Sequence, residues 1–140
     1  MKFLCIGNRF LNPDGAAIWL MEAAQEVSEQ WLPTTQWVEG GLGGLNLLLH
    51  FETTDPVVIV DYAPDYPHAS LIPWSQLQLA LPTHYDHNTA LYYGLHTLNQ
   101  LLDPPPPLAL FSLNPKTTTD WQAQALDRLA QLQSQPERLH

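Results

Sequence analysis

Two carboxylates and one imidazole stand at positions of the sequence where they would suit a metal ion. Asp14 follows the first apolar run, Asp61 ends the most strongly apolar run, and His87 begins a stretch with helical periodicity. In an open parallel sheet, the carboxyl ends of the strands form one edge, and ligands bind along that edge. The three residue types therefore predict a divalent-metal site that leaves room for a fourth, external ligand.

Each of the three residues also has an ordinary structural explanation. Asp14 would stabilise a helix dipole by about 0.3–1 kcal/mol, Asp61 would cap the turn after its strand, and His87 would be a surface residue at a helix start. Three such placements along one predicted edge favour a shared site over three coincidences. His84 precedes His87 in the same segment, and spacing alone does not choose between the two histidines.

The apolar pattern predicts strands and helices in alternation. Strands are expected over residues 2–6, 34–38, 57–60, 69–72 and 108–113, and helices over residues 12–32, 45–49, 87–102 and 119–132. Residues 74–79 fit either a turn of helix or an extended segment. Such alternation is typical of a doubly wound α/β fold with helices on both sheet faces. We therefore expect one domain over residues 1–140, a three-layer α/β/α sandwich with a mostly parallel central sheet of about five strands.

Capping signals predict where the longer helices start. Asn12 is suited to cap the first helix, Pro13 to occupy its first position, and Asp14 to lie in its first turn. Thr118 or Thr119 is suited to cap the last helix.

The composition argues against several classes of protein. The formal net charge of −9 disfavours a nucleic-acid partner, which needs a basic surface. No apolar stretch reaches the length that spans a bilayer, so we expect a cytoplasmic protein without membrane insertion. Cys5 is the only cysteine, which excludes a disulfide framework, and it is expected to be a small buried apolar residue.

Two common catalytic motifs are missing from the sequence. The glycine-rich segments lack both the Gly-x-Gly-x-x-Gly pattern of dinucleotide sites and the Lys-Ser/Thr pair of a phosphate-binding loop. There is no Gly-x-Ser-x-Gly elbow, so an α/β-type serine hydrolase is disfavoured as well.

The glycine-containing segments resemble those of one family, the hydrogenase maturation proteases. Gly7-Asn8, followed by Asp14-Gly15, is similar to the family's opening Gly-Asn-…-Asp-Asp/Glu-Gly motif. Residues 39–44, which we expect to form a glycine-rich turn, resemble the family's Asp-Gly-Gly-Thr-x-Gly segment.

The later segments extend the resemblance through nearly the whole chain, in the same order. The run 57–61 is similar to the family's apolar strand that ends in aspartate. His87, followed by Leu91, is similar to the family's His-x-x-x-Leu helix start, which favours His87 over His84.

The resemblance implies a nickel-dependent processing endopeptidase. Members of the family remove a C-terminal extension from the large-subunit precursor of a nickel–iron hydrogenase, after nickel has been inserted. The metal-binding and catalytic positions of the family fall here on Asp14, Asp61 and His87. The nickel is expected to arrive with the precursor, and carboxylate and imidazole ligands suit an ion that is not retained as thiolates would retain it.

The same resemblance implies contacts with the precursor from the two glycine-containing segments. These substrate contacts are expected from Asn8, Glu39, Gly40 and Gly41.

Four positions depart from the family pattern. Pro13 replaces an acidic residue, Glu39 and Leu42 stand where aspartate and threonine are usual, and Tyr62 replaces a small residue. These departures support an alternative, in which the chain is a non-catalytic precursor- or metal-binding module on the same fold. A metal-assisted hydrolase acting on another peptide is a third interpretation, because fold and ligands do not determine the substrate.

Overall fold

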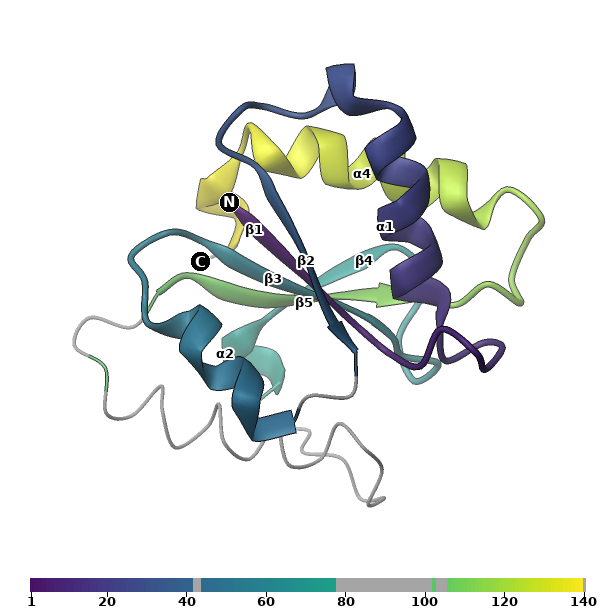
Figure 1. Cartoon of the computed structure of the whole chain (residues 1–140), viewed down its shortest axis with the longest axis horizontal. Helices are drawn as coiled ribbons and strands as arrows, with labels where there is room; N and C mark the ends of the chain where they lie inside the picture. Colours follow the sequence, from purple (N-terminus) through teal and green to yellow (C-terminus); the bar gives the residue numbers. More distant parts are fainter. Residues whose placement is uncertain (42–43, 78–101, 103–105, 140) are drawn as a thin grey trace.

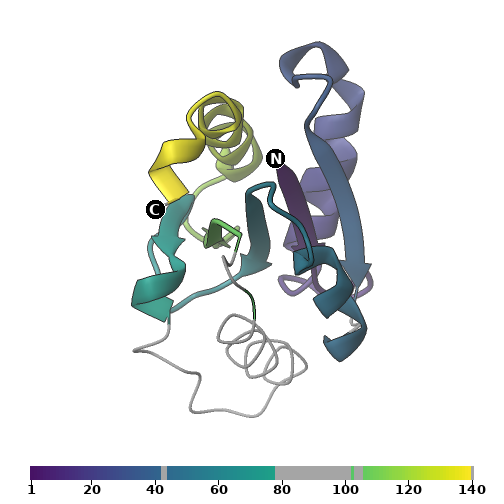
Figure 2. The same cartoon turned by 90° about the vertical axis from the view of Figure 1, so that its left-hand side faces the viewer.

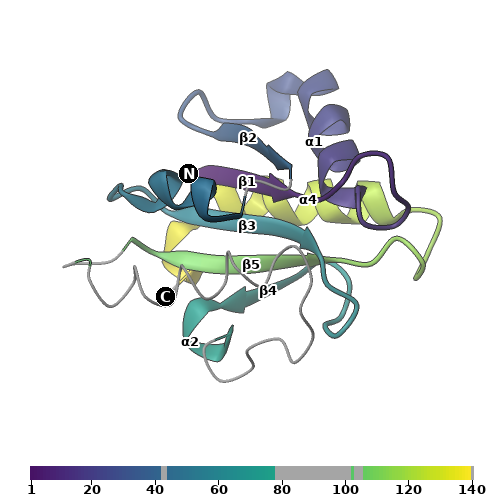
Figure 3. The same ribbon diagram turned by 60° about the horizontal axis from the view of Figure 1, so that its bottom comes forward.

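A five-stranded sheet forms the centre of the molecule (Figure 1). The computed structural model describes residues 1–41, 44–77, 102 and 106–139. The strands are β1 (Lys2–Ile6), β2 (Gln36–Gly41), β3 (Val57–Tyr62), β4 (Ser70–Pro73) and β5 (Leu108–Leu113). Their order in the sheet is β2-β1-β3-β5-β4, which Figure 3 shows from below. All neighbouring pairs are parallel except β4–β5, which is antiparallel.

Helices cover both faces of the sheet (Figures 1 and 2). The α-helices are α1 (Ala16–Glu26), α2 (Trp74–Leu77) and α4 (Trp121–Gln133), and the 3-10 helices are η1 (Ser28–Gln30), η2 (Gly44–Phe51) and η3 (Pro136–Leu139). One face packs against α1 and α4, and the other packs against η2 and α2. The predicted α/β sandwich with a mostly parallel sheet is therefore confirmed. Within the described residues, no helix has the length and apolar character needed to cross a membrane.

Strands β1, β3 and β5 are almost uniformly apolar because both of their faces are covered. Phe3 and Cys5 of β1 face α1 and α4, whereas Leu4 and Ile6 face η2 and α2. All four side chains are buried. Continuous apolar runs are the expected pattern for parallel strands between two layers of helix, and this is why residues 2–6 and 108–113 were predicted with the observed bounds.

The first helix is shorter at both ends than its sequence pattern predicts. It starts at Ala16 rather than Asn12, and Asp14 lies outside the helix, so the predicted cap and first-turn charge are wrong. The helix ends at Glu26 because the chain then turns into η1 and brings Trp31 back against it. The indole N–H of Trp31 donates a hydrogen bond to the carbonyl oxygen of Ala24, at 2.9 Å, beside the backbone N–H of Val27, which donates to the same oxygen at 3.1 Å.

Other element boundaries differ from the predictions by a few residues. Strand β2 begins later than predicted and includes Glu39, Gly40 and Gly41, which we had expected in a turn. Helix α4 follows Asp120, and Thr118 accepts the backbone N–H of Asp120 instead of capping the helix. The sequence left open whether residues 74–79 form a turn of helix or an extended segment. Residues 74–77 form the short helix α2. The helix predicted from His87 lies outside the described residues.

Two tryptophans of one aromatic cluster allow a measurement of how much the hydrogen bond at the end of α1 contributes to stability. Trp31 and Trp37 lie 5.0 Å apart between ring centroids, and both pack on Phe3. The Trp37 indole nitrogen is buried and bonds to no group within the described part of the chain. Trp31→Phe and Trp37→Phe therefore remove similar atoms, but only the first removes a hydrogen bond. We expect Trp31→Phe to lower the free energy of unfolding by about 1 kcal/mol more than Trp37→Phe in urea titrations. Equal losses would show that the Trp31 bond does not stabilise the end of α1.

Candidate functional site

The loop between β1 and α1 is shaped by two glycines that allow its backbone to fold back on itself. Gly7 has φ +145°, and a Cβ atom there would lie 2.1 Å from the carbonyl oxygen of Asp14. A Cβ atom on Gly15 would lie 2.6 Å from the carbonyl oxygen of Asn8. Neither position accepts a side chain without movement of the backbone, so the glycines allow both ends of the loop to approach each other.

This close approach places the Asp14 side chain at the carboxyl end of β1. The backbone N–H of Asn8 donates to Oδ2 of Asp14 at 2.8 Å, which orients the carboxylate. The amide oxygen of Asn8 accepts the backbone N–H of Phe10 at 3.0 Å. Asn8 therefore organises the loop through both its backbone and its side chain. Its predicted contact with a substrate stays a prediction.

Asp61 lies at the same edge of the sheet, on the neighbouring strand. It is 2% exposed and is the fifth residue of β3, not the residue after the strand as the sequence suggested. Val60, which precedes it, is in register with Cys5 of β1. The chain adds β2 on one side of β1 and then β3 on the other side. The order in which strands are added to the sheet therefore reverses between β1 and β3. Asp14 and Asp61 therefore both lie at the switch point, where ligands bind in open α/β sheets.

The predicted third ligand cannot be placed beside these carboxylates. His87 and its competitor His84 both lie outside the described residues. Within the described part of the chain, no group of three or more His, Cys, Asp or Glu residues is arranged to hold a metal. The structure thus brings two of the three predicted ligands to one edge, and the complete set stays a prediction.

Cys5 is buried within strand β1, an environment that disfavours a nucleophilic role. Burial raises the pKa of its thiol, and the negative charges of Glu39 and Asp61 raise that pKa further. Because the thiolate is the reactive form, this environment keeps the side chain inert. The prediction that Cys5 is a small buried apolar residue is confirmed.

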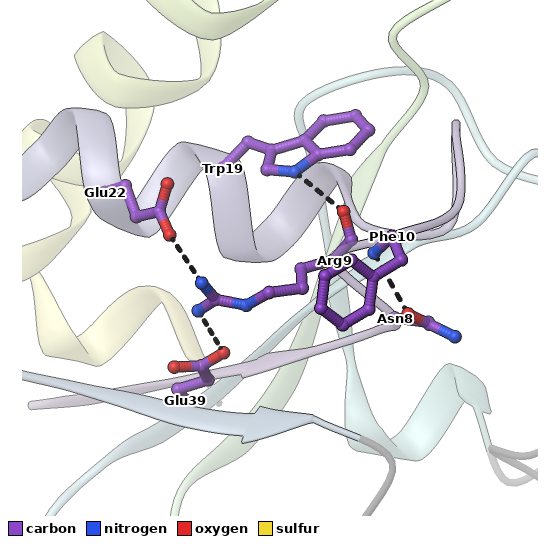
Figure 4. A network of polar contacts seen from close by, with 6 residues as sticks. All are labelled: Asn8, Arg9, Phe10, Trp19, Glu22 and Glu39. Carbon is purple, nitrogen blue, oxygen red and sulfur yellow. Dashed lines mark hydrogen bonds and ion pairs between the residues drawn. The ribbon is translucent and has the colours of Figure 1, made fainter.

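An ion-pair network that the sequence analysis missed ties the loop to α1 and β2 (Figure 4). Nη1 of Arg9 lies 3.3 Å from Oε1 of Glu22, and Nη2 lies 2.5 Å from Oε1 of Glu39. The hydrogen bond to Glu39 and its charge are the main causes that raise the pKa of Arg9. The indole N–H of Trp19 donates to the carbonyl oxygen of Arg9 at 3.2 Å. No local pattern in the sequence indicates this network, because Arg9, Glu22 and Glu39 lie far apart along the chain.

The end of β2 is joined to the loop by its glycines. The backbone N–H of Gly7 donates to the carbonyl oxygen of Gly41 at 3.1 Å, beside a register shift between β1 and β2. Gly41 has φ +55°, and no atom of the described residues lies within 4 Å of the place where a Cβ atom would be. A Cβ atom on Gly40 would lie 3.1 Å from a methyl carbon of Leu47. The predicted substrate contacts of Glu39, Gly40 and Gly41 are not tested by this arrangement.

A pair of glycine substitutions tests whether the close contact at Gly7 holds the site together. Gly7→Ala should lower the free energy of unfolding by at least about 2 kcal/mol, because a strained φ and an overlap with Asp14 act together. Gly41 has a positive φ but no overlap with a described atom, so Gly41→Ala should lower the free energy of unfolding by only about 1 kcal/mol. Urea titrations measure both values. A smaller loss for Gly7→Ala than for Gly41→Ala would contradict the contact.

Comparison with solved structures identifies the fold. No protein-family model and no curated protein matches the sequence. The structure is similar to the hydrogenase maturating endopeptidase HybD from E. coli, with 19% identity, a TM-score of 0.63, and 96% of this chain and 93% of that chain covered. An endopeptidase from Escherichia coli gives 20% identity and a TM-score of 0.66, covering 96% and 93% of the two chains.

A third similar structure is also that of a hydrogenase maturation protease. The [NiFe] hydrogenase maturation protease HycI from Thermococcus kodakarensis has 19% identity and a TM-score of 0.57, with 94% of this chain and 88% of that chain covered. The similarity extends over nearly the full length of each chain. The resemblance noted in the sequence is therefore confirmed at the level of the fold: this chain has the fold of the hydrogenase maturation proteases.

Proposed function

We propose that this protein is an endopeptidase that removes the C-terminal extension from a nickel-loaded large-subunit precursor of a nickel–iron hydrogenase. The observation that carries the proposal is the placement of Asp14 and Asp61 at the carboxyl ends of the adjacent strands β1 and β3. Both carboxylates belong to the motifs that resemble the maturation proteases. The similar solved structures are named endopeptidases or maturation proteases, and they share this fold along almost the whole chain.

The donor atoms of these two residues fit a divalent ion that enters with the substrate. Carboxylate oxygens bind Ni²⁺ less tightly than thiolates do, which suits an ion that must stay with the precursor. Asp14 and Asp61 would hold the nickel, with His87 as the proposed third ligand. Nickel so held would polarise the scissile carbonyl or acidify a water molecule.

The two carboxylates have different tasks in this proposal. Asp14 is half-buried, and its orientation is set by the Asn8 amide, so it would meet the incoming ion first. Asp61 is almost fully buried, and a charge in such a place interacts more strongly with a cation than a solvated charge does. The loop that carries Asp14 is braced by Arg9 against α1 and β2, which limits its movement when the substrate binds.

One contact favours the alternative of a non-catalytic module. The resemblance expects a substrate contact from Glu39, yet its carboxylate is bonded to Arg9. A binding module on the same fold would hold a precursor or its nickel without cutting. Precursor turnover separates the two functions.

The processing activity predicts a specific mass change. Incubation with a nickel-loaded precursor should shorten the precursor at its C-terminus, as measured by intact mass spectrometry. Asp14→Asn and Asp61→Asn should each lower the rate at least about a hundredfold, because loss of a metal ligand removes several kcal/mol of transition-state stabilisation. The cleavage rates of His87→Ala and His84→Ala are compared to identify the third ligand. The variant with the larger loss of rate lacks that ligand.

Asp55→Asn provides the matched control for these variants. Asp55 is exposed and precedes β3, at the opposite edge of the sheet, so its substitution should leave the rate unchanged. An unchanged precursor mass with the unmodified protein, beside an active maturation protease, would exclude processing and favour the binding module. Full activity in both the Asp14 and Asp61 variants would show that the site is wrongly assigned.

A further inference from the structure

A cavity beside the candidate site has no role in the proposed chemistry. It has a volume of about 430 Å³ and is lined by Asn12, Trp19, Pro115, Lys116, Trp121 and Gln122. Asn12 belongs to the same loop as Asp14, and Pro115 follows the carboxyl end of β5. The cavity therefore lies at the edge of the sheet that carries the two carboxylates, on the face covered by α1 and α4.

Hydrogen bonds hold the walls of this cavity in place. The backbone N–H of Asn114 donates to Nδ1 of His68 at 2.8 Å, so the other ring nitrogen, Nε2, carries the proton. Nε2 then donates to the carbonyl oxygen of Trp121 at 3.0 Å. The rings of His68 and Trp121 also meet edge to face, with centroids 6.2 Å apart. His68 thus fixes both ends of the segment 114–121, and the opposite wall is fixed by the Trp19–Arg9 bond.

Lys116 gives the cavity a positive charge that no partner among the described residues neutralises. Each of the other four Lys and Arg side chains donates to a carbonyl or side-chain oxygen. Within the described part of the chain, the ammonium group of Lys116 makes no hydrogen bond or ion pair, and the residue is exposed. In a protein with a net charge of −9, a cation left for solvent beside an aromatic cavity is suited to pair with an anion from outside.

The lining residues indicate what kind of ligand this anion belongs to. Two indole rings offer apolar surface and the edge-to-face or stacked contacts that aromatic side chains prefer. The volume lies within the range of small ligand pockets. A single lysine matches one carboxylate, whereas a phosphate would meet too few cations on a strongly acidic protein. An apolar side chain next to a carboxylate fits best, and a peptide supplies both.

We propose that this cavity is a peptide-binding subsite, in which Trp19 and Trp121 hold an aromatic or large apolar side chain while Lys116 pairs with an adjacent carboxylate. The proposal rests on the processing function for its ligand, which is the precursor segment that reaches beyond the cleavage site. The carboxylate comes from an acidic side chain or from the C-terminus of that segment. The subsite selects precursors by sequence and takes no part in the bond cleavage.

Small probes test the subsite without any precursor. N-acetyl-L-phenylalanine carries a carboxylate beside its ring, and N-acetyl-L-phenylalanine amide carries none. In NMR titrations of the whole protein, both probes should shift the indole N–H signals of Trp19 and Trp121 and leave those of Trp31, Trp37 and Trp74 in place. The carboxylate probe should bind about threefold more tightly than the amide, as expected for an exposed ion pair.

Substitutions of two cations give the matched comparison. Lys116→Gln should abolish the preference for the carboxylate probe. Arg138→Gln removes the same charge from η3, beyond the far end of α4, and should preserve that preference. A third probe, N-acetyl-Asp-Phe-amide, places the carboxylate on a side chain. Tighter binding of this probe than of N-acetyl-L-phenylalanine assigns the anion to an acidic side chain, and the reverse order assigns it to a C-terminus.

The outcomes for the subsite and for the processing function can be told apart. Absence of shifts at Trp19 and Trp121, or equal affinity of the charged and neutral probes, would overturn the subsite even if the precursor is cleaved. Lys116-dependent probe binding together with an uncleaved precursor would retain the subsite and reject processing. If both proposals hold, Lys116→Gln should raise KM for the precursor about threefold and leave kcat unchanged.

Discussion

The close packing of the Gly7 backbone against the carbonyl group of Asp14 is the constraint on which the rest of the candidate site depends. The chain leaves β1 through a conformation that a side chain would obstruct, and it returns to the same place before α1 begins. The Asn8 amide then reaches the Asp14 carboxylate. The same loop brings Arg9 to its two glutamates and Asn12 to the cavity. One backbone contact thus positions a carboxylate, an ion-pair network and one wall of a subsite.

The sheet provides the other half of the arrangement. Apolar strands covered on both faces form a rigid centre, and their carboxyl ends meet at one edge. Asp61 is carried to that edge by a strand whose other side chains are almost all buried. Burial is the main cause that raises the pKa of the nearby Cys5 thiol, and the negative charges of Glu39 and Asp61 raise that pKa further. A charge buried at this position interacts strongly with a cation, which is the basis of the metal-binding role proposed for Asp61.

The distribution of positive charge distinguishes structural from functional cations. Arg9 joins three segments, and Arg128 donates to the carbonyl oxygen of Ala69, which has a positive φ. These guanidinium groups bind other segments of the chain and so help to stabilise the fold. Lys116 lines an aromatic cavity and, among the described residues, makes no such bond, which is why we assign it to a ligand. His68 supports that cavity through both ring nitrogens.

The sequence by itself determined the elements whose pattern is local. Strands β1 and β5 were predicted with their observed bounds, because a short apolar run between two turns has few alternatives in a parallel sheet. The apolar spacing of Trp121, Ala125, Leu129 and Leu132 likewise predicted α4 and its inner face, and of these four residues only Trp121 is not fully buried. Asp61 was singled out because it ends such a run, and the structure places it near the carboxyl end of β3.

Only the tertiary structure decided the features that depend on contacts between distant segments. Helix α1 starts after Asp14 because Gly7 and Gly15 let the loop fold back, although Asn12 and Pro13 are locally good helix starters. Glu39–Gly41 extend β2 because they pair with β1, although glycines usually favour a turn. Trp19 and Trp121 line one cavity because α1 and α4 cover the same face of the sheet. Local preferences differ by about 1 kcal/mol, and burial and strand pairing outweigh them.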